Sequence, residues 1–411
     1  MQSRTKLFSL LVMLTGVLFG QNLTRELTAS ELESLVIKQN PELKALANKI
    51  KATEGALLQS RLRLNPELEL ENGTGGDPEA LFRLNQTFLT GGKRKKRSKI
   101  AELELEKTKM DYSLLKAQLI KGARAAFIDV LLYQEMVALY KEKVSVAKDF
   151  LTAIQLRVEA GRLSPAEESR ARVALASSKI ALNQANRTLR NHWKQLASFW
   201  GSTTTDYAIA VGELKSVEAP PTYQILSQSI AESPLLKQAD IEVRIQQATV
   251  NLELANRIPD LTLGAGIRRT DVPDNTYEAS LSIPIPIFNR NQGTVEKARA
   301  LTGQALQEKA AREIQIQTLL SSIYTDLQVA YDETQALQTT ILPEAENAYL
   351  IIRDGYLQGK FDYLDVIDAQ NTLFEAKENW LEASSDYYKA YAELEWLLGQ
   401  TLNSISGLSK E

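Results

Sequence analysis

One stretch of the sequence, residues 92–160, contains no proline and is dominated by Ala, Leu, Glu, Lys and Gln. Residues of these types favour helix formation, and an uninterrupted helix of this length would reach roughly 100 Å. A second stretch, 293–358, is similar but contains Pro343, where we expect a kink. Helices this long cannot lie on a globular core. The sequence therefore predicts coiled coils packed side by side.

The chain is an internal duplication. Pro234 follows Pro41 by 193 residues, and Pro259 follows Pro66 by the same interval. Later matches lie 198 residues apart, so the second copy carries extra residues between the two sets. These later matches are Gly161–Arg162 with Gly359–Lys360, Lys179 with Lys377, and Gly201 with Gly399. A repeat of this length predicts one structural plan used twice.

The two copies are expected to span residues 21–201 and 223–400, with a connector at 202–222 and a C-terminal tail at 401–411. Each copy is predicted to form a helix, two strands, a long helix, a tight turn and a returning helix. The tight turns are expected at 161–164 and 359–362.

The first helix of each copy is predicted to end before a proline. In the first copy it is expected to begin at Ser30, an N-cap residue with Glu33 in the capping-box position, and to end before Pro66. Its counterpart is expected to cover residues 222–257 and to end before Pro259.

Four short segments, two in each copy, alternate apolar residues with polar, small or charged ones. A period of two predicts strands with one apolar face and one polar face. The segments are 66–72, 80–89, 259–269 and 276–286. The expected polar face includes Arg83, Asn85, Thr262, Arg268, Glu278 and Ser280.

Residues 1–20 are expected to be a cleaved secretory signal, because Arg4 and Lys6 precede an apolar stretch and Gly20 offers a small residue for cleavage. A membrane anchor is the alternative, but the apolar stretch, Leu7–Phe19, is shorter than the roughly 20 residues that a spanning helix needs. The absence of cysteine excludes disulfides, thiolate metal sites and a lipidated cysteine. The net charge of −3 gives no reason to expect a nucleic-acid partner.

The alternating strands have two explanations. One is an antiparallel sheet whose apolar face lies on a soluble core. The long helices leave nothing to cover such a face, and an exported chain has lipid available instead. In lipid a sheet must close into a barrel, and single-chain barrels begin at about eight strands. Chains must therefore share one barrel, and three copies of four strands would give twelve, with the polar faces lining a water-filled lumen.

The sequence resembles the outer membrane efflux protein family, the TolC-like exit ducts. The most specific part is the stretch from Tyr356 through Gly359 and Asp365 to Asp368-Ala369-Gln370, and the duplication and proline-led strands add to it. The Ile-Pro-Ile-Pro-Ile-Phe stretch at 283–288, leading to Asn291-Gln292-Gly293, is similar to the branch that serves cobalt-zinc-cadmium exporters.

The resemblance implies a mainly α fold with a small transmembrane β part. Long coiled-coil helical hairpins and four strands per chain would form a homotrimer, with a 12-stranded β-barrel in the outer-membrane lipid and a periplasmic α-barrel below it. It implies two partners, a periplasmic adaptor and a proton-driven inner-membrane transporter. The hairpin tips would contact the adaptor; their residues are Gly161, Arg162, Leu163, Ser164, Tyr356, Gly359, Lys360, Phe361 and Asp362.

The resemblance also places Asp365 and Asp368 just inside the periplasmic entrance, where family members carry aspartate rings. Residues three apart share a helix face, so three chains would present six carboxylates around one axis. The alternative is a solvated helix face with two acids, which is common. The first copy departs from the pattern, with Glu167 and Arg170 at the matching positions.

Other signals indicate no chemistry. The basic run Lys93–Arg97 is interpreted as a collar facing solvent or lipid headgroups, and the single histidine, His192, as a packed or surface residue. One His and no Cys leave no triad or ordinary zinc site, so we expect no catalysis, cofactor or tightly bound metal. The preferred function is a passive efflux duct for heavy-metal cations or small molecules; the alternatives are an exported coiled-coil scaffold or adhesin, and an exported hydrolase.

Overall fold

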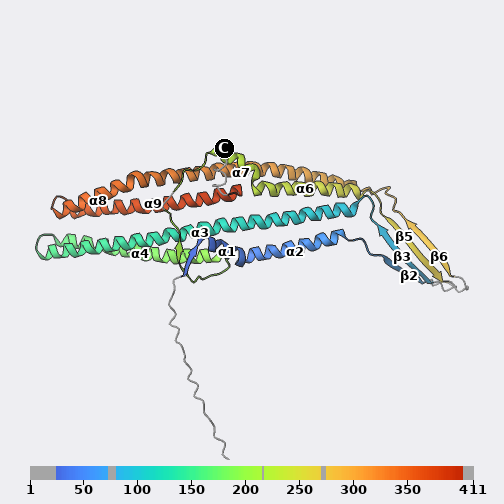
Figure 1. Cartoon of the computed structure of the whole chain (residues 1–411), viewed down its shortest axis with the longest axis horizontal. Coiled ribbons are helices and arrows are strands. Elements are labelled where there is room, and N and C mark those ends of the chain that lie inside the picture. Colours follow the sequence, from blue (N-terminus) through green and yellow to red (C-terminus); the bar gives the residue numbers. More distant parts are fainter. Residues whose placement is uncertain (1–24, 73–79, 215–216, 270–274, 401–411) are drawn as a thin grey trace, which may run out of the picture.

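The computed structural model describes residues 25–72, 80–214, 217–269 and 275–400. The predicted signal at 1–20 and the tail at 401–411 lie outside this part. The chain is a long rod of nearly parallel helices, with a four-stranded sheet at one end and two helical hairpin tips at the other (Figure 1). The predicted class, mainly α with long helices and four alternating strands, is confirmed.

Within the described residues, no helix is both long and apolar enough to cross a membrane.

The first helix of the first copy is interrupted, which corrects the prediction of one helix from Ser30. Helix α1, Ala29–Gln39, is capped by Thr28, whose side chain accepts from the Glu31 N–H. The chain then breaks at Asn40, and its side chain caps α2, Pro41–Arg61, by accepting from two backbone N–H groups. A proline suits the first position of a helix but cannot continue one, so the Asn-Pro pair begins a new helix.

The long helices follow the prediction closely. Helix α3, Lys93–Glu159, runs without interruption. Its counterpart is α7, Gln292–Ala336, which passes through a π-helical turn, Leu337–Ile341, into α8, Leu342–Leu357. The π-helical turn ends two residues before Pro343, which lacks the N–H that an α-helix would use. The remaining helices are α4 (Pro165–Ser198), α5 (Tyr223–Gln228), a 3-10 turn (Ser229–Glu232), α6 (Pro234–Ala255) and α9 (Tyr363–Leu398).

The four strands form one antiparallel sheet in the order β2-β3-β5-β6. The last strand stops at Ser282 rather than at 286, because Pro284 and Pro286 cannot donate to a strand ladder. The strands are β2 (Glu67–Asn72), β3 (Ala80–Phe88), β5 (Leu261–Arg269) and β6 (Thr276–Ser282).

A second, two-stranded sheet lies at the middle of the rod, and the sequence did not predict it. Strand β1, Arg25–Thr28, pairs in parallel with β4, Tyr207–Val211, so the connector at 202–222 contains a strand. The side chain of Gln134 on α3 holds β4 by donating to the Ala210 carbonyl at 3.0 Å and accepting from its N–H at 2.7 Å.

The duplication extends to individual contacts. Asn40 donates to the Phe199 carbonyl at 2.9 Å, and Ser233 donates to the Leu397 carbonyl at the same distance. After α4 and α9, a glycine with positive φ lies against the first proline of another helix: Gly201 against Pro41, and Gly399 against Pro234. Each contact joins the start of one helix to the end of another, and it fixes both helices at the middle of the rod, beside the two largest buried clusters.

One ion pair between the copies predicts a pH dependence. Lys107 on α3 contacts Glu242 on α6 at 2.5 Å, and the hydrogen bond from Lys107 lowers the pKa of Glu242 against a smaller effect of burial. A lowered pKa means stabilisation that is present above the unfolded-state value and lost as the pH falls through the folded-state value. Glu242→Gln should therefore reduce the loss of Tm between neutral and acidic pH; an unchanged acid dependence would contradict this role.

Candidate functional site

The sheet is built inside out compared with that of a soluble protein. Its outward apolar side chains are exposed, with Tyr277 at 80% and Leu281 at 62%. Others on the same face, Leu68, Leu70, Phe82, Leu84, Leu263 and Ile267, are exposed too. Scattered exposed apolar residues are ordinary, but a contiguous apolar face marks an interaction surface.

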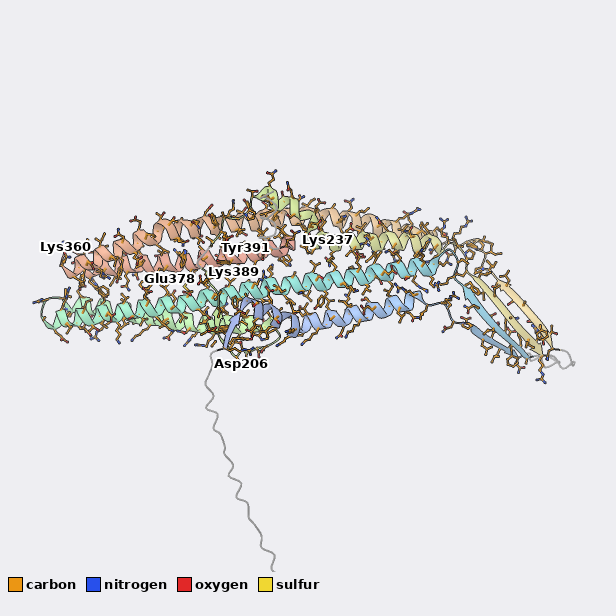
Figure 2. All side chains as sticks on the ribbon, viewed as in Figure 1. Asp206, Lys237, Lys360, Glu378, Lys389 and Tyr391 are labelled. Atoms are coloured by element: carbon orange, nitrogen blue, oxygen red, sulfur yellow. The ribbon has the colours of Figure 1, made fainter. Side chains whose placement is uncertain are left out.

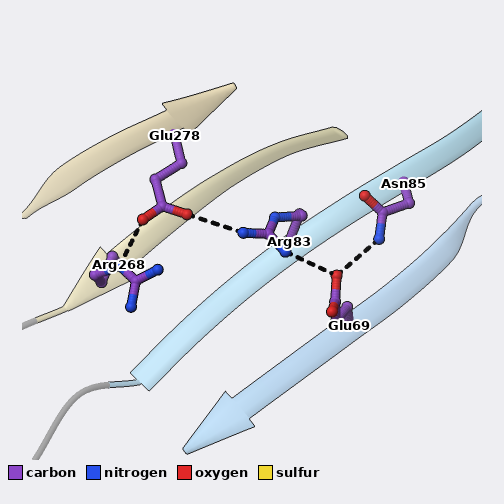
Figure 3. A network of polar contacts seen from close by, with 5 residues as sticks. All are labelled: Glu69, Arg83, Asn85, Arg268 and Glu278. Atoms are coloured by element: carbon purple, nitrogen blue, oxygen red, sulfur yellow. Dashed lines mark hydrogen bonds and ion pairs between the residues drawn. The ribbon is translucent and has the colours of Figure 1, made fainter. Parts of the chain in front are cut away.

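The other face carries a network of charges that crosses all four strands (Figure 3). Strand register places Glu69, Arg83, Gly266 and Glu278 in one row. Arg83 donates to Glu69 at 3.1 Å and to Glu278 at 3.0 Å, and Arg268 donates to the second oxygen of Glu278. Because the carboxylates and guanidinium groups alternate along the row, each charge has a partner of opposite sign.

Two glycines make this network possible. Arg83 reaches Glu278 across Gly266, where a Cβ would lie 2.8 Å from the Phe82 carbonyl oxygen and 3.3 Å from the Arg83 Cβ. A Cβ at Gly264 would lie 2.3 Å from the Ser280 Oγ and 2.4 Å from the Asn85 Oδ1. The space above these two glycines of β5 is therefore occupied by side chains of β3 and β6.

The structure brings together the six polar-face positions that the alternation predicted. Register places Arg83 and Asn85 opposite Gly266 and Gly264, which in turn lie opposite Glu278 and Ser280. Thr262 pairs with Thr87 through their hydroxyls at 2.9 Å, and Arg268 binds Glu278. Glu69, which the alternation with Leu68 and Leu70 also assigns to the polar face, joins these positions by accepting from both Arg83 and Asn85.

The tips of the two hairpins have the same turn. Gly161 and Gly359 adopt positive φ, and the next N–H, of Arg162 or Lys360, bonds back to the carbonyl five residues earlier. This is the Schellman ending of a helix. The labelled Lys360 marks the second tip, at the opposite end of the rod from the sheet (Figure 2). Ser164 caps α4 by accepting from the Ala166 N–H.

Tyr356 differs from the other predicted tip residues because it is buried, at 5% exposure. Its ring lies 6.4 Å from that of Phe150 and 6.1 Å from that of Tyr363. Leu163 packs partly against the same cluster, whereas Phe361, exposed at the tip, lies over Gly355. Tyr356 therefore supports the tips from inside and does not offer a contact surface of its own.

Asp365 and Asp368 are both exposed, near the start of α9. Asp365 also has a local role, because its carboxylate accepts from the Asp362 N–H at 2.9 Å in a capping-box arrangement. The matching residues of the first copy, Glu167 and Arg170, contact each other at 3.4 Å. The second hairpin thus presents two acids, and the first presents an acid paired with a base.

The residues judged free of chemistry have structural partners. His192 stacks on Tyr133 with ring centres 4.6 Å apart. In the basic run, Lys93 contacts Asp260 at 2.7 Å and Arg97 donates to the carbonyls of Ser60 and Leu62. The described residues contain no group of three or more His, Cys, Asp or Glu side chains that could hold a metal ion.

Comparisons with known proteins agree with this architecture. The family described as outer membrane efflux protein matches residues 32–202 and 225–400. The cobalt-zinc-cadmium resistance protein CzcC of Cupriavidus metallidurans is 31% identical over 385 residues, covering 93% of this chain and 92% of that protein. The outer membrane protein TolC of Escherichia coli is 21% identical, covering 95% of this chain and 87% of that one.

Among solved structures, CusC has the same fold with a TM-score of 0.77 at 17% identity, covering 90% of this chain and 92% of that chain. VceC of Vibrio cholerae gives a TM-score of 0.74 at 17% identity, covering 91% of this chain and 96% of that one. The family resemblance read from residues 356–370 is confirmed, because the family match and the CzcC relative each cover most of the sequence. This chain belongs to the outer membrane efflux protein family.

Proposed function

We propose that three copies of this chain form the outer-membrane channel of an efflux pump for heavy-metal cations. The chain is an outer-membrane efflux channel by its family, which consists of transporters and not of enzymes. The trimer, the metal cargo and the partners are the proposed part.

The inside-out sheet is the observation that carries the trimer. In lipid every backbone N–H and C=O must be paired, yet β2 and β6 pair on one side only within the described residues. The four strands alternate in direction, so β6 of one copy would meet β2 of the next in antiparallel orientation. Three copies would then close a barrel with the Arg83 network inside and the apolar face in lipid.

The mass of the detergent-extracted protein tests the shared barrel. Light scattering corrected for bound detergent should give a mass equal to that of three chains. The protein should precipitate when the detergent is removed. A monomer or dimer that stays dissolved in buffer would show that another surface of the same protein covers the apolar face.

Metal cargo is proposed from the name and similarity of CzcC, with support from Asp365 and Asp368, which are both exposed near the tip. Deleting the chain from its host should lower tolerance to cobalt, zinc and cadmium salts more than tolerance to organic drugs. A larger loss of tolerance to organic drugs than to the metal salts would assign small organic molecules as the cargo.

We propose that the hairpin tips contact a periplasmic adaptor, which joins the channel to a proton-driven inner-membrane transporter. Exposed side chains of both tips, Arg162, Lys360 and Phe361, offer that surface. The paired glycine turns support the proposal, because they hold both tips in the same shape.

Asp365 and Asp368 are proposed to form the acidic entrance. Replacing both with asparagine should lower the cation preference of single-channel current and weaken its block by divalent cations, because six carboxylates would be lost from one axis. Asparagine retains an acceptor oxygen for the helix cap. Asp386→Asn, the same change far along α9, should leave both properties unaltered. Unchanged selectivity in the double variant would refute the entrance assignment.

A further inference from the structure

The outward apolar row of β6 continues beyond the end of the strand. Tyr277 and Leu281 point outward, and the same alternation continues through Ile283, Ile285 and Ile287, which are all exposed. Ile285 is 79% exposed, and Phe288 next to the row is 90% exposed. The hydrogen-bonded sheet has ended at Ser282, so the apolar surface is longer than the sheet that begins it.

This segment is held in place although its side chains are uncovered. Ile287 N–H bonds to the Ile285 carbonyl at 3.0 Å, and Gln292 donates to the Phe288 carbonyl at 3.2 Å. Asn291, in the left-handed conformation, donates to the backbone and side chain of Glu253 on α6 at 2.9 and 2.7 Å. The exposure is therefore a fixed property of the fold.

The prolines argue against another strand as the cover. Pro284 and Pro286 occupy the alternate positions of the segment and have no N–H to donate. A neighbouring chain could pair with β6 itself, but it could not continue a full strand ladder along residues 283–287. Acyl chains match the apolar side chains in chemistry, and the backbone of the segment can take its hydrogen bonds from water in the adjoining headgroup layer.

The dimensions also favour lipid. At ~3.4 Å per residue and a strand tilt of ~40°, the seven residues of β6 cover roughly 18 Å along the membrane normal, less than the ~25 Å apolar band of outer-membrane barrels. Continuing the row to Ile285, where the hydrogen bond from the Ile287 N–H closes a turn, brings the length to about 26 Å, which covers this band.

Charge marks the limit of the apolar surface. Arg290 lies two residues after Phe288 and is exposed. Arg94 and Lys95 are exposed in the first turn of α3. Helix α3 begins at the junction of the strands and the helices (Figure 1). The opposite edge of the sheet has a similar arrangement, in which Leu62 and Leu64 are exposed before Pro66 and continue the outward row of Leu68. Cationic side chains beside an apolar band suit phospholipid headgroups.

We propose that the side chains of Ile283, Ile285, Ile287 and Phe288 reach the phospholipid acyl chains at the boundary of the outer membrane while their backbone lies in the hydrated headgroup layer, so that the membrane-facing surface ends near Arg290 and not at the last strand. This inference rests on the proposed channel, and it adds to it the position of the membrane boundary.

The absence of cysteine permits a direct test without a cysteine-free background. Single variants Leu281→Cys, Ile285→Cys and Phe288→Cys carry a nitroxide label in the full-length protein, reconstituted in phosphatidylglycerol and phosphatidylethanolamine vesicles. Electron paramagnetic resonance measures collisions with oxygen, which concentrates in lipid, and with a nickel chelate, which stays in water. Val173→Cys, exposed on α4, is the aqueous control.

The expected result is high oxygen and low nickel accessibility at 281, 285 and 288, with the opposite at 173. Lipid exposure at 281 with nickel accessibility at 285 and 288 would overturn the boundary and leave the channel intact. An immobilised label at 285, shielded from both reagents, would identify a protein cover and also overturn it. Nickel accessibility at all positions would refute the proposed channel itself.

Discussion

Replacing Arg83 with glutamine should make the channel several-fold more selective for cations. Arg83 is the base that Glu69 and Glu278 share, with 3.1 and 3.0 Å between the charged atoms. Its loss leaves Glu69 with only the Asn85 amide and Glu278 with only Arg268 among the partners drawn in Figure 3. One positive charge per chain then disappears from the proposed lumen.

The expected size follows from simple electrostatics. A carboxylate within ~4 Å of a passing cation attracts it by about 1 kcal/mol even at the dielectric constant of water, which corresponds to roughly a fivefold change in an equilibrium. Three chains would each contribute one uncompensated acid. The potassium-to-chloride permeability ratio, from reversal potentials across a planar bilayer, measures the change.

Two variants separate lumen charge from other effects. Arg269→Gln removes the same charge from the opposite face of β5 and should leave the ratio near that of the wild type. Arg83→Gln combined with Glu278→Gln restores the charge balance and should return the ratio toward the wild-type value. Equal effects of the Arg83 and Arg269 variants would show that the network does not face the permeating ions.

Gly399→Ala should cost about 2–5 kcal/mol of stability, the largest loss we expect from a single added methyl group. Gly399 has a φ of 69°, where a side chain costs about 1–2 kcal/mol. The new Cβ would also lie 2.5 Å from the Pro234 Cγ and 2.6 Å from its Cδ, and overpacking of this kind costs a further 1–3 kcal/mol. The midpoint of urea unfolding in detergent, followed by far-ultraviolet circular dichroism, reports the loss.

Two other glycines serve as matched controls. Gly92 has the same φ of 69° but no atom within 4 Å of an added Cβ, so Gly92→Ala should show only the backbone cost, about 1–2 kcal/mol. Gly201, whose Cβ would lie 2.9 Å from Pro41, should fall between them. Equal losses at all three positions would mean that the contact between the glycine and the proline contributes nothing.

The faces of the sheet could be predicted because alternation depends only on the geometry of a strand. That geometry is enough to assign Arg83, Asn85 and Glu278 to one face. The end of β6 was predicted too late, since a period of two does not register the missing N–H of Pro284. Both features are local, and the sequence contained the information for each.

Other features depend on contacts that a local pattern cannot contain. Strands β1 and β4 are only four and five residues long, and they exist because they pair with each other and because Gln134 binds Ala210. The burial of Tyr356 likewise depends on Phe150, which lies on another hairpin. The break at Asn40 was in principle readable, because an Asn-Pro pair is both a helix stop and a helix start.

The inside-out sheet leaves a single chain without a suitable solvent. Water would surround the apolar row that includes Tyr277 and Leu281, whereas lipid would surround the charges of the Arg83 network and the edges of β2 and β6 that pair with no strand of the described residues. Water suits the polar face but not the apolar face, and lipid suits the apolar face but not the charges or the backbone of the sheet edges. In the proposed trimer, membrane insertion and association of the chains would therefore occur together, because a single subunit is stable neither in water nor in lipid.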